Sequence, residues 1–431
     1  MTATWTNWTG DQACRPAAYE RPRSTEDIKN ALEHAAARRW TVRVAGAGHS
    51  FNDAVVTDGM LLSLDDMDRI IDVDRATGSV RVQAGIRLRS LNEQLDALGL
   101  ALENLGDIDV QSIAGATATG THGTGVKLRS LSASIQSLEM VLADGRVREI
   151  NEQTDPDEWR AARISLGALG VVSEVTLRTV PAFSLKAVTR AEPLEAVLKS
   201  LDERIDTNDH FEFYMFPHSN HAMTLTNNRV DDPPKERSKA SAWLHDIFLV
   251  NTMFGIMCRT GRRFHRAIPT VNRVSARLSG APTRIDRSYR VFASQRFVRF
   301  TETEYAFRRE DCAEAVREVK RMIERRRYDV PFPLEVRFAA ADDAYLAPTY
   351  GRETCHFSAH MFEKMEWRPY FAEFERIMDH LGARPHWGKR HFQTASTLAE
   401  RYPKWGDFQA VRKRFDPHGM FANEHMRRVL G

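Results

Sequence analysis

The first 180 residues alternate between short apolar runs and amphipathic stretches. An alanine-rich segment with helical periodicity predicts a helix over residues 27–39, and the apolar run at residues 41–44 predicts a strand directly after it. Alternation at residues 79–85 predicts another strand, and the pattern at residues 87–100 predicts a helix that ends near Gly99. These elements describe a region of mixed strands and helices.

A hairpin and two more strands belong to the same region. Short apolar runs predict strands around Leu61 and Ile70. In residues 138–150, Asp144 and Gly145 separate two alternating runs, which is typical of a tight turn between antiparallel strands.

Beyond residue 181 the pattern changes to longer strands and longer helices, interrupted by a polar insertion at residues 231–241. The segment at residues 210–216 is predicted to be one of these strands. The change indicates a second domain, so we expect domains over residues 1–180 and 181–388.

Two predicted strands in the second domain each have a polar face. In residues 333–339, period-two alternation places Glu335 and Arg337 on one face and apolar residues on the other. In residues 354–362, the same alternation places His356, Ser358 and His360 together on a polar face that needs a hydrogen-bonding partner. A structural ion pair and a structural histidine at position 360 are the competing interpretations.

Two glycine-rich segments indicate backbone that contacts a ligand. Residues 45–53, AGAGHSFND, place His49 at the end of a glycine turn that follows a strand. Residues 113–125, IAGATATGTHGTG, are too small and polar to predict a core helix. Glycines let backbone N–H groups approach a phosphate closely, although ordinary structural turns would have the same composition.

These glycine segments do not fit two common nucleotide-binding patterns. Neither has the GxGxxG order that opens a long helix, and the chain contains no GxxxxGK[ST]. Nicotinamide-binding and P-loop interpretations are therefore excluded.

The composition is that of a globular protein. A chain of 431 residues suggests two or three domains. Its formal net charge of +3, from 61 basic and 58 acidic residues, argues against nucleic acid as the main partner. The basic runs at residues 262–266 and 320–327 lie in amphipathic helical patterns, which favours solvent-exposed faces.

The cysteines and the apolar segments indicate no disulfide, metal or membrane class of protein. The four cysteines are far apart and include no CxxC pair, so we expect neither a disulfide framework nor a metal cluster. His356 and His360 could imitate a metal pair on a helix, but no glutamate accompanies them in the HExxH manner. Without a ligand pattern of either kind, we expect no metal ion. The sequence predicts no signal peptide and no transmembrane segment, so we expect a cytoplasmic protein.

Several motifs together carry a family resemblance. They are AGAGHSFND, ENLGDIDVQSIAGATATGTHGTG, SLGALGVV, LEVRF, ARPHWGK and FDPHGMFAN, in this order between residues 45 and 423. The chain resembles the aldonolactone oxidases and alditol oxidases of the vanillyl-alcohol oxidase flavoprotein superfamily. The resemblance implies an α+β fold, with a two-part FAD-binding domain, an α+β substrate domain and a closing segment, residues 389–431, that returns to the FAD domain.

The resemblance also implies the site residues. Catalytic or substrate-binding roles fall on Glu335, Arg337, Lys389, His356, Ser358 and His360. Cofactor binding falls on Arg43, Gly46, Ala47, Gly48, His49, Ser50, Gly106, Asp107, Ser112, Gly115, Thr119, Gly120, His122, Gly123 and Val172. His49 is the candidate for a covalent bond to the flavin, as in family members with histidine here.

The activity implied is oxidation of a sugar-derived 1,4-lactone, of the L-gulono- or D-arabinono- type, with hydride transfer to flavin N5 and oxygen reduced to hydrogen peroxide. Gly106 matches a position where glycine leaves room for oxygen. Asp107 departs from the serine that alditol oxidases and many eukaryotic lactone oxidases have at this position, so their substrate contacts are not transferred directly to this chain. We expect a substrate other than an open-chain alditol. The alternatives are an alditol oxidase, a lactone dehydrogenase with another acceptor, and a flavin-binding protein without turnover, which the polar residues argue against.

Overall fold

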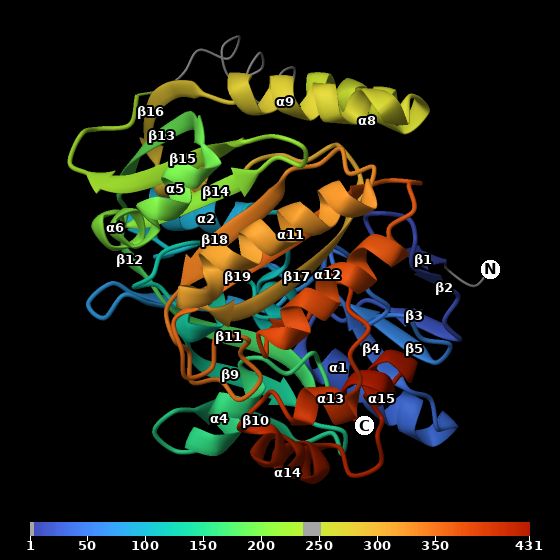
Figure 1. Cartoon of the computed structure of the whole chain (residues 1–431). Coiled ribbons are helices and arrows are strands. Elements are labelled where there is room, and N and C mark those ends of the chain that lie inside the picture. Colours follow the sequence, from blue (N-terminus) through green and yellow to red (C-terminus); the bar gives the residue numbers. More distant parts are fainter. Residues whose placement is uncertain (1–3, 236–250) are drawn as a thin grey trace.

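The computed structural model describes residues 4–235 and 251–431, so the end of the polar insertion, from residue 236, lies outside the described part (Figure 1). Near the N-terminus, β3 (Ala18–Glu20), β5 (Met60–Ser63) and β4 (Val42–Ala45) form a parallel sheet in that order. Helix α1 (Thr25–Arg38) begins after Ser24, whose side chain accepts a hydrogen bond from the Asp27 amide. Its apolar stripe packs with the buried strand residues Val42 and Leu62.

A second, antiparallel sheet follows in the sequence. Its strand order is β10 (Val147–Asn151), β9 (Ile135–Val141), β11 (Val171–Arg178), β7 (Ser79–Gln83) and β6 (Ile70–Asp74). The predicted hairpin is confirmed, since β9 and β10 pair across a turn in which Gly145 has a φ of 79°. Helix α2 (Leu88–Ala97) packs its leucines into the core of this sheet.

The third sheet has eight strands and dominates the second half of the chain. Its order is β16 (Ala281–Arg287), β13 (Ser184–Pro193), β15 (His221–Val230), β14 (His210–Met215), β18 (Leu334–Ala339), β19 (Thr354–Phe362), β17 (Phe300–Arg308) and β20 (Arg384–Pro385). Figure 1 shows α11 (Cys312–Arg326) and α12 (Arg368–His380) across one face of this sheet. That face carries Phe213, Phe307, Val336 and Phe357, which pack with the helices in one apolar core.

Smaller elements complete the described residues. The short strands are β1 (Trp5–Thr6), β2 (Ala13–Cys14), β8 (Leu100–Ala101) and β12 (Val180–Pro181). The other helices before the C-terminal segment are α3 (Ile113–Ala118), α4 (Pro156–Ala162), α5 (Leu194–Lys199), α6 (Leu201–Thr207), α8 (Phe254–Arg263), α9 (Ile268–Leu278) and α10 (Ser288–Phe292). No helix in the described ranges is long and apolar enough to cross a bilayer.

The C-terminal segment packs against the first half of the chain. It contains α13 (Ala395–Ala399), α14 (Trp405–Phe415) and α15 (Glu424–Leu430). Phe408, Phe415 and Met426 share a core with the five-stranded sheet, and the Val42 amide donates to the Met420 carbonyl at 2.8 Å. The chain therefore closes on the region where it began (Figure 1).

The expectation that residues 113–125 form no core helix is wrong for the first half of that segment. Residues Ile113–Ala118 form α3, with Ser112 as its N-cap accepting from the Gly115 amide. Ile113 and Ala116 are fully buried, so tertiary packing outweighs the small and polar composition. The segment from residue 120 onwards lies outside the helix, with Gly120 at a φ of 73°.

Candidate active site

The face of the eight-stranded sheet opposite the helices is polar and buried. Four adjacent strands contribute side chains by alternation: Glu212 and Tyr214 from β14, Glu335 and Arg337 from β18, His356, Ser358 and His360 from β19, and Glu302 and Glu304 from β17. The register places Glu335 between Tyr214 and Ser358 and pairs Arg337 with His356. The predicted alternation on both strands is confirmed.

A charge cluster surrounds Arg337 at the centre of this face. Its guanidinium lies 2.5 Å from Glu335 Oε1 and, through Nε, 3.2 Å from Glu212 Oε2. It also forms a close ion pair with Asp107, which reaches in from the N-terminal half of the chain and pairs with Arg296 at 3.1 Å. The cluster therefore joins the large sheet to the glycine-rich half.

The acids of this cluster differ in protonation because their surroundings differ. Burial opposes ionisation of Glu335, but the Arg337 charge and a hydrogen bond from Tyr214 hold its pKa below the ordinary value. Burial raises the pKa of Glu212 to about 8, despite the opposing charge of Arg337. At neutral pH the site thus contains an ionised Glu335 beside a protonated Glu212.

A second pair lies where β17 meets the turn after β20. Lys389 Nζ lies 2.5 Å from Glu302 Oε2, and His360 Nε2 lies 3.6 Å from Glu302 Oε1. Although burial opposes it, the Lys389 charge lowers the pKa of Glu302 to about 2. Lys389 therefore has a fixed counter-ion, and its Nζ also lies 5.0 Å from the ring centre of Phe51.

Three histidines surround Glu304. His122 Nε2 lies 2.7 Å and His356 Nδ1 lies 3.1 Å from Glu304 Oε1, and these two rings stack with centroids 3.6 Å apart. Burial lowers the pKa of His356 to about 3 and that of His386 to about 4. Possible ligand atoms of His122, Glu304 and His386 lie within 4.8 Å of one another, a spacing that can hold a metal ion. The absence of a metal stays a prediction.

Sequence analysis missed several residues of this face. They are Glu212, Tyr214, Arg296, Glu302, Glu304 and His386. The signal for the two β17 acids was the alternation at residues 300–308, FTETEYAFR, and the segment at 210–216, HFEFYMF, has a similar pattern. Arg296 lies in an irregular stretch between α10 and β17, where no periodicity identifies it.

The two glycine-rich segments meet. A Cβ on Gly46 would lie 2.6 Å from Ser112 Oγ and 3.6 Å from Gly115 Cα, so only glycine allows this approach. Within the described part of the chain, the amides of residues 46–50 donate no hydrogen bond to another residue. Half-buried, unpaired N–H groups on a glycine loop are typical of a phosphate site, so the loop fits the pyrophosphate of FAD.

His49 lies at the end of this loop. Its ring stacks on Trp8 with centroids 5.4 Å apart, and Nδ1 lies 3.0 Å from the Ala47 carbonyl. Burial lowers the pKa of His49, so the imidazole is neutral at neutral pH. Because a carbonyl only accepts, the hydrogen belongs on Nδ1 and the lone pair of Nε2 is available.

The remaining predicted cofactor residues have the following places. Arg43 is buried and donates to the carbonyls of Ala54, Leu166, Gly167 and Phe421, so its guanidinium is engaged by backbone. Thr119 donates to the Gly115 carbonyl, Val172 is half-buried on β11, and a Cβ on Gly123 would clash with the Leu105 carbonyl at 2.2 Å. Ala47, Gly48 and Ser50 belong to the 46–50 loop.

The fold defines a class of protein. A solved structure titled "Solvent-stable cholesterol oxidase" superposes with a TM-score of 0.85 at 16% identity, over 98% of this chain and 96% of its own. The chain therefore shares its fold with such cholesterol oxidases, and its mixture of helices and sheets confirms the predicted α+β fold. A family model for an FAD binding domain matches residues 16–151, which confirms FAD as the cofactor type.

The family follows from the rest of the chain. The D-arabinono-1,4-lactone oxidase model matches residues 175–429, and the chain belongs to this family. It is 47% identical, over the full length of both chains, to L-gulono-1,4-lactone dehydrogenase of Mycobacterium tuberculosis. It is 33% identical to L-gulonolactone oxidase of Mus musculus, over 98% of this chain and 97% of the relative.

The raised pKa of Glu212 predicts a pH-dependent cost to stability. The folded protein keeps the proton on Glu212 up to about pH 8, whereas the unfolded chain releases it near 4.5. Burial of Glu212 therefore costs no stability below pH 4.5, where the folded and unfolded states are both protonated. The free energy of unfolding then falls as the pH rises to about 8. We expect Glu212→Gln, which imitates the protonated acid, to raise Tm relative to wild type more at the upper end of this window.

Thermal unfolding of the holoprotein at both ends of the window checks this expectation. Glu314→Gln, on the exposed side of α11, is the matched control and should change Tm equally at both pH values. A Tm difference between Glu212→Gln and wild type that does not grow with pH would contradict the assignment.

Proposed function

We propose that this protein oxidises a CH–OH group of a sugar-derived 1,4-lactone of the L-gulono or D-arabinono type. The observation that carries the proposal is the buried polar face, where the ion pair of Glu335 and Arg337 lies beside Ser358 and is joined through Asp107 to the glycine-rich half. The names of the two relatives, an L-gulono-1,4-lactone dehydrogenase and an L-gulonolactone oxidase, support the substrate class.

We propose that Glu335 binds the substrate hydroxyl and helps to remove its proton. Oxidation of an alcohol to a carbonyl removes a hydride from carbon and a proton from oxygen. FAD, when bound, supplies the hydride acceptor. Glu335 is ionised at neutral pH and is oriented by Tyr214 and Arg337, so it can accept a hydrogen bond from the substrate hydroxyl and then its proton.

The neighbouring groups are suited to binding and charge stabilisation. Arg337 and Lys389 are buried or half-buried cations with fixed counter-ions, and such preorganised charge stabilises negative charge that develops during reaction. Ser358, His356 and His360 lie on the same face and can hydrogen bond to the hydroxyl groups of a sugar ring. Lactone hydroxyls are the substrate groups that this polar surface fits.

Asp107 differs chemically from the serine of alditol oxidases. Its carboxylate is engaged by Arg337 and Arg296, so it cannot provide the neutral hydroxyl contact of that serine.

We further propose oxygen as the electron acceptor, with hydrogen peroxide as product. Gly106 supports this, because in the resembling enzymes a glycine at this position leaves room for oxygen, and Gly106 presents no side chain there. A non-oxygen acceptor is the second candidate, favoured by the dehydrogenase name of the 47% identical relative.

Anaerobic mixing of the purified holoprotein with L-gulono-1,4-lactone, D-arabinono-1,4-lactone and xylitol tests the function. We expect the flavin absorbance to bleach with a lactone and not with xylitol, and to return with peroxide when air is admitted. Bleaching by xylitol alone, or by none of the three, would overturn the lactone assignment. If the flavin stays reduced in air but is reoxidised by a dye, the electron acceptor is not oxygen.

We also propose that His49 attaches the flavin covalently, since its neutral imidazole keeps a lone pair on Nε2. After acid precipitation, yellow colour should remain with the wild-type protein and be lost from His49→Ala. His34→Ala, at a half-exposed histidine on α1, is the control and should keep the colour. Release of all flavin from wild type on precipitation would rule the bond out.

A further inference from the structure

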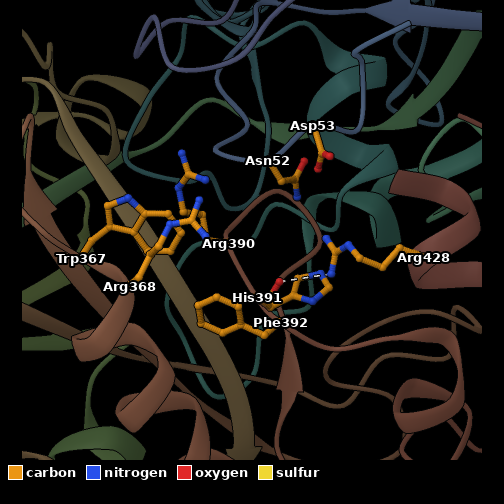
Figure 2. Close-up of a pocket in the computed structure, with 8 residues that line it drawn as sticks. All are labelled: Asn52, Asp53, Trp367, Arg368, Arg390, His391, Phe392 and Arg428. Carbon is orange, nitrogen blue, oxygen red and sulfur yellow. Dashed lines mark hydrogen bonds between the residues drawn. The ribbon is translucent and has the colours of Figure 1, made fainter. Parts of the chain in front are cut away.

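A cavity of about 250 Å³ lies beside the turn that carries Lys389 (Figure 2). Its lining includes three arginines, Arg368, Arg390 and Arg428, together with His391 and the rings of Trp367 and Phe392. These residues come from the start of α12, the segment after β20, and α15. None of them belongs to the polar face of the large sheet.

The charge of the cavity is predominantly positive. Arg390 forms a close ion pair with Asp11, but Arg368 and Arg428 have no carboxylate within 4.0 Å in the described part of the chain. Arg428 donates instead through Nη1 to the carbonyls of Gln393, at 2.8 Å, and His391, at 3.3 Å, and its Nη2 lies 3.2 Å from His425 Nδ1.

The one acid that lines the cavity is already engaged. Asp53 Oδ1 lies 2.6 Å from His425 Nδ1, and this contact, against the effect of burial, lowers the pKa of Asp53 to about 2. The guanidinium groups of Arg368 and Arg428 therefore keep donors that no protein anion satisfies.

His391 is the second, independent sign of a ligand. His391 is one of the residues that line the cavity, it is only 7% exposed, and neither of its ring nitrogens has a hydrogen-bond partner among the described residues. Figure 2 shows the ring beside Phe392 and close to the guanidinium of Arg428. A buried, unpaired imidazole N–H is unfavourable, so an acceptor in the cavity would stabilise it.

We propose that this cavity binds a small oxyanion, a phosphate or a carboxylate, between Arg368, Arg428 and His391. Guanidinium groups make charge-assisted hydrogen bonds to such oxygens, and the imidazole adds one further N–H donor. A planar guanidinium fork matches the spacing of two oxygens on one carboxylate or phosphate group.

The anion site and the candidate active site share one turn of backbone. Asn52, which lines the cavity, donates to the carbonyls of Trp387 at 2.7 Å and Lys389 at 3.0 Å. Lys389 extends to Glu302 on the polar face, while Arg390 and His391 line the cavity. The two sites are therefore adjacent but distinct, and the anion site does not depend on the proposed lactone chemistry.

Calorimetric titration of the flavin-loaded protein in low-salt buffer tests the proposal, with inorganic phosphate and L-gulonate as separate probes. We expect one site per chain for at least one probe. Arg368→Ala and Arg428→Gln should each weaken binding by about tenfold, the value of one charge-assisted hydrogen bond. Arg427→Ala, at the exposed neighbour of Arg428 on α15, is the matched control and should bind as wild type does.

Phosphate binding without gulonate binding would assign the site to phosphoryl ligands, and the reverse to carboxylates; both support the proposal. Arg368 is exposed at the start of α12, so its replacement keeps the test valid even if Arg428→Gln fails to fold. The proposal is overturned if neither probe binds at millimolar concentration, or if Arg368→Ala and Arg427→Ala bind with equal affinity.

Discussion

The burial of the Arg337 guanidinium among Glu335, Glu212 and Asp107 is the interaction on which the site depends. A charge removed from water is costly unless it is paired, and leaving one partner of a buried pair unmatched typically costs about 3–5 kcal/mol. Two of these acids come from the large sheet and Asp107 comes from the other half of the chain, so the cluster exists only when both halves are folded together.

Two other buried carboxylates on the polar face also pair with groups from distant parts of the chain. Glu302 holds Lys389, which follows the last strand of the sheet, and Glu304 holds His122, which belongs to the second glycine-rich segment. Each buried carboxylate thus fixes a group from a distant part of the sequence. Arg43 also links distant parts of the chain, because its guanidinium donates to the Leu166 and Phe421 carbonyls. The charged side chains that we propose for catalysis thus also make contacts between distant parts of the chain.

Local periodicity predicted much of this arrangement. Two polar faces, Glu335 with Arg337 and the trio on β19, follow from alternation alone, because strand geometry fixes which side chains share a face. Alternation did not predict which strands are neighbours, because the pairing of β17 with β19 and of β14 with β18 joins segments that are distant in sequence. Glu304 and Glu212 were therefore missed as site residues. The short helix α3 was missed because burial of Ile113 and Ala116, which composition does not reveal, stabilises it.

The central claim is that Glu335 acts as the base on this buried face. Stopped-flow measurement of anaerobic flavin reduction by L-gulono-1,4-lactone tests it most directly, with wild type, Glu335→Gln and the surface variant Glu314→Gln compared. General-base catalysis predicts a reduction rate lower by about 10²–10⁴ in Glu335→Gln, with flavin content unchanged and the surface variant unaffected. An unchanged reduction rate in Glu335→Gln would contradict the account.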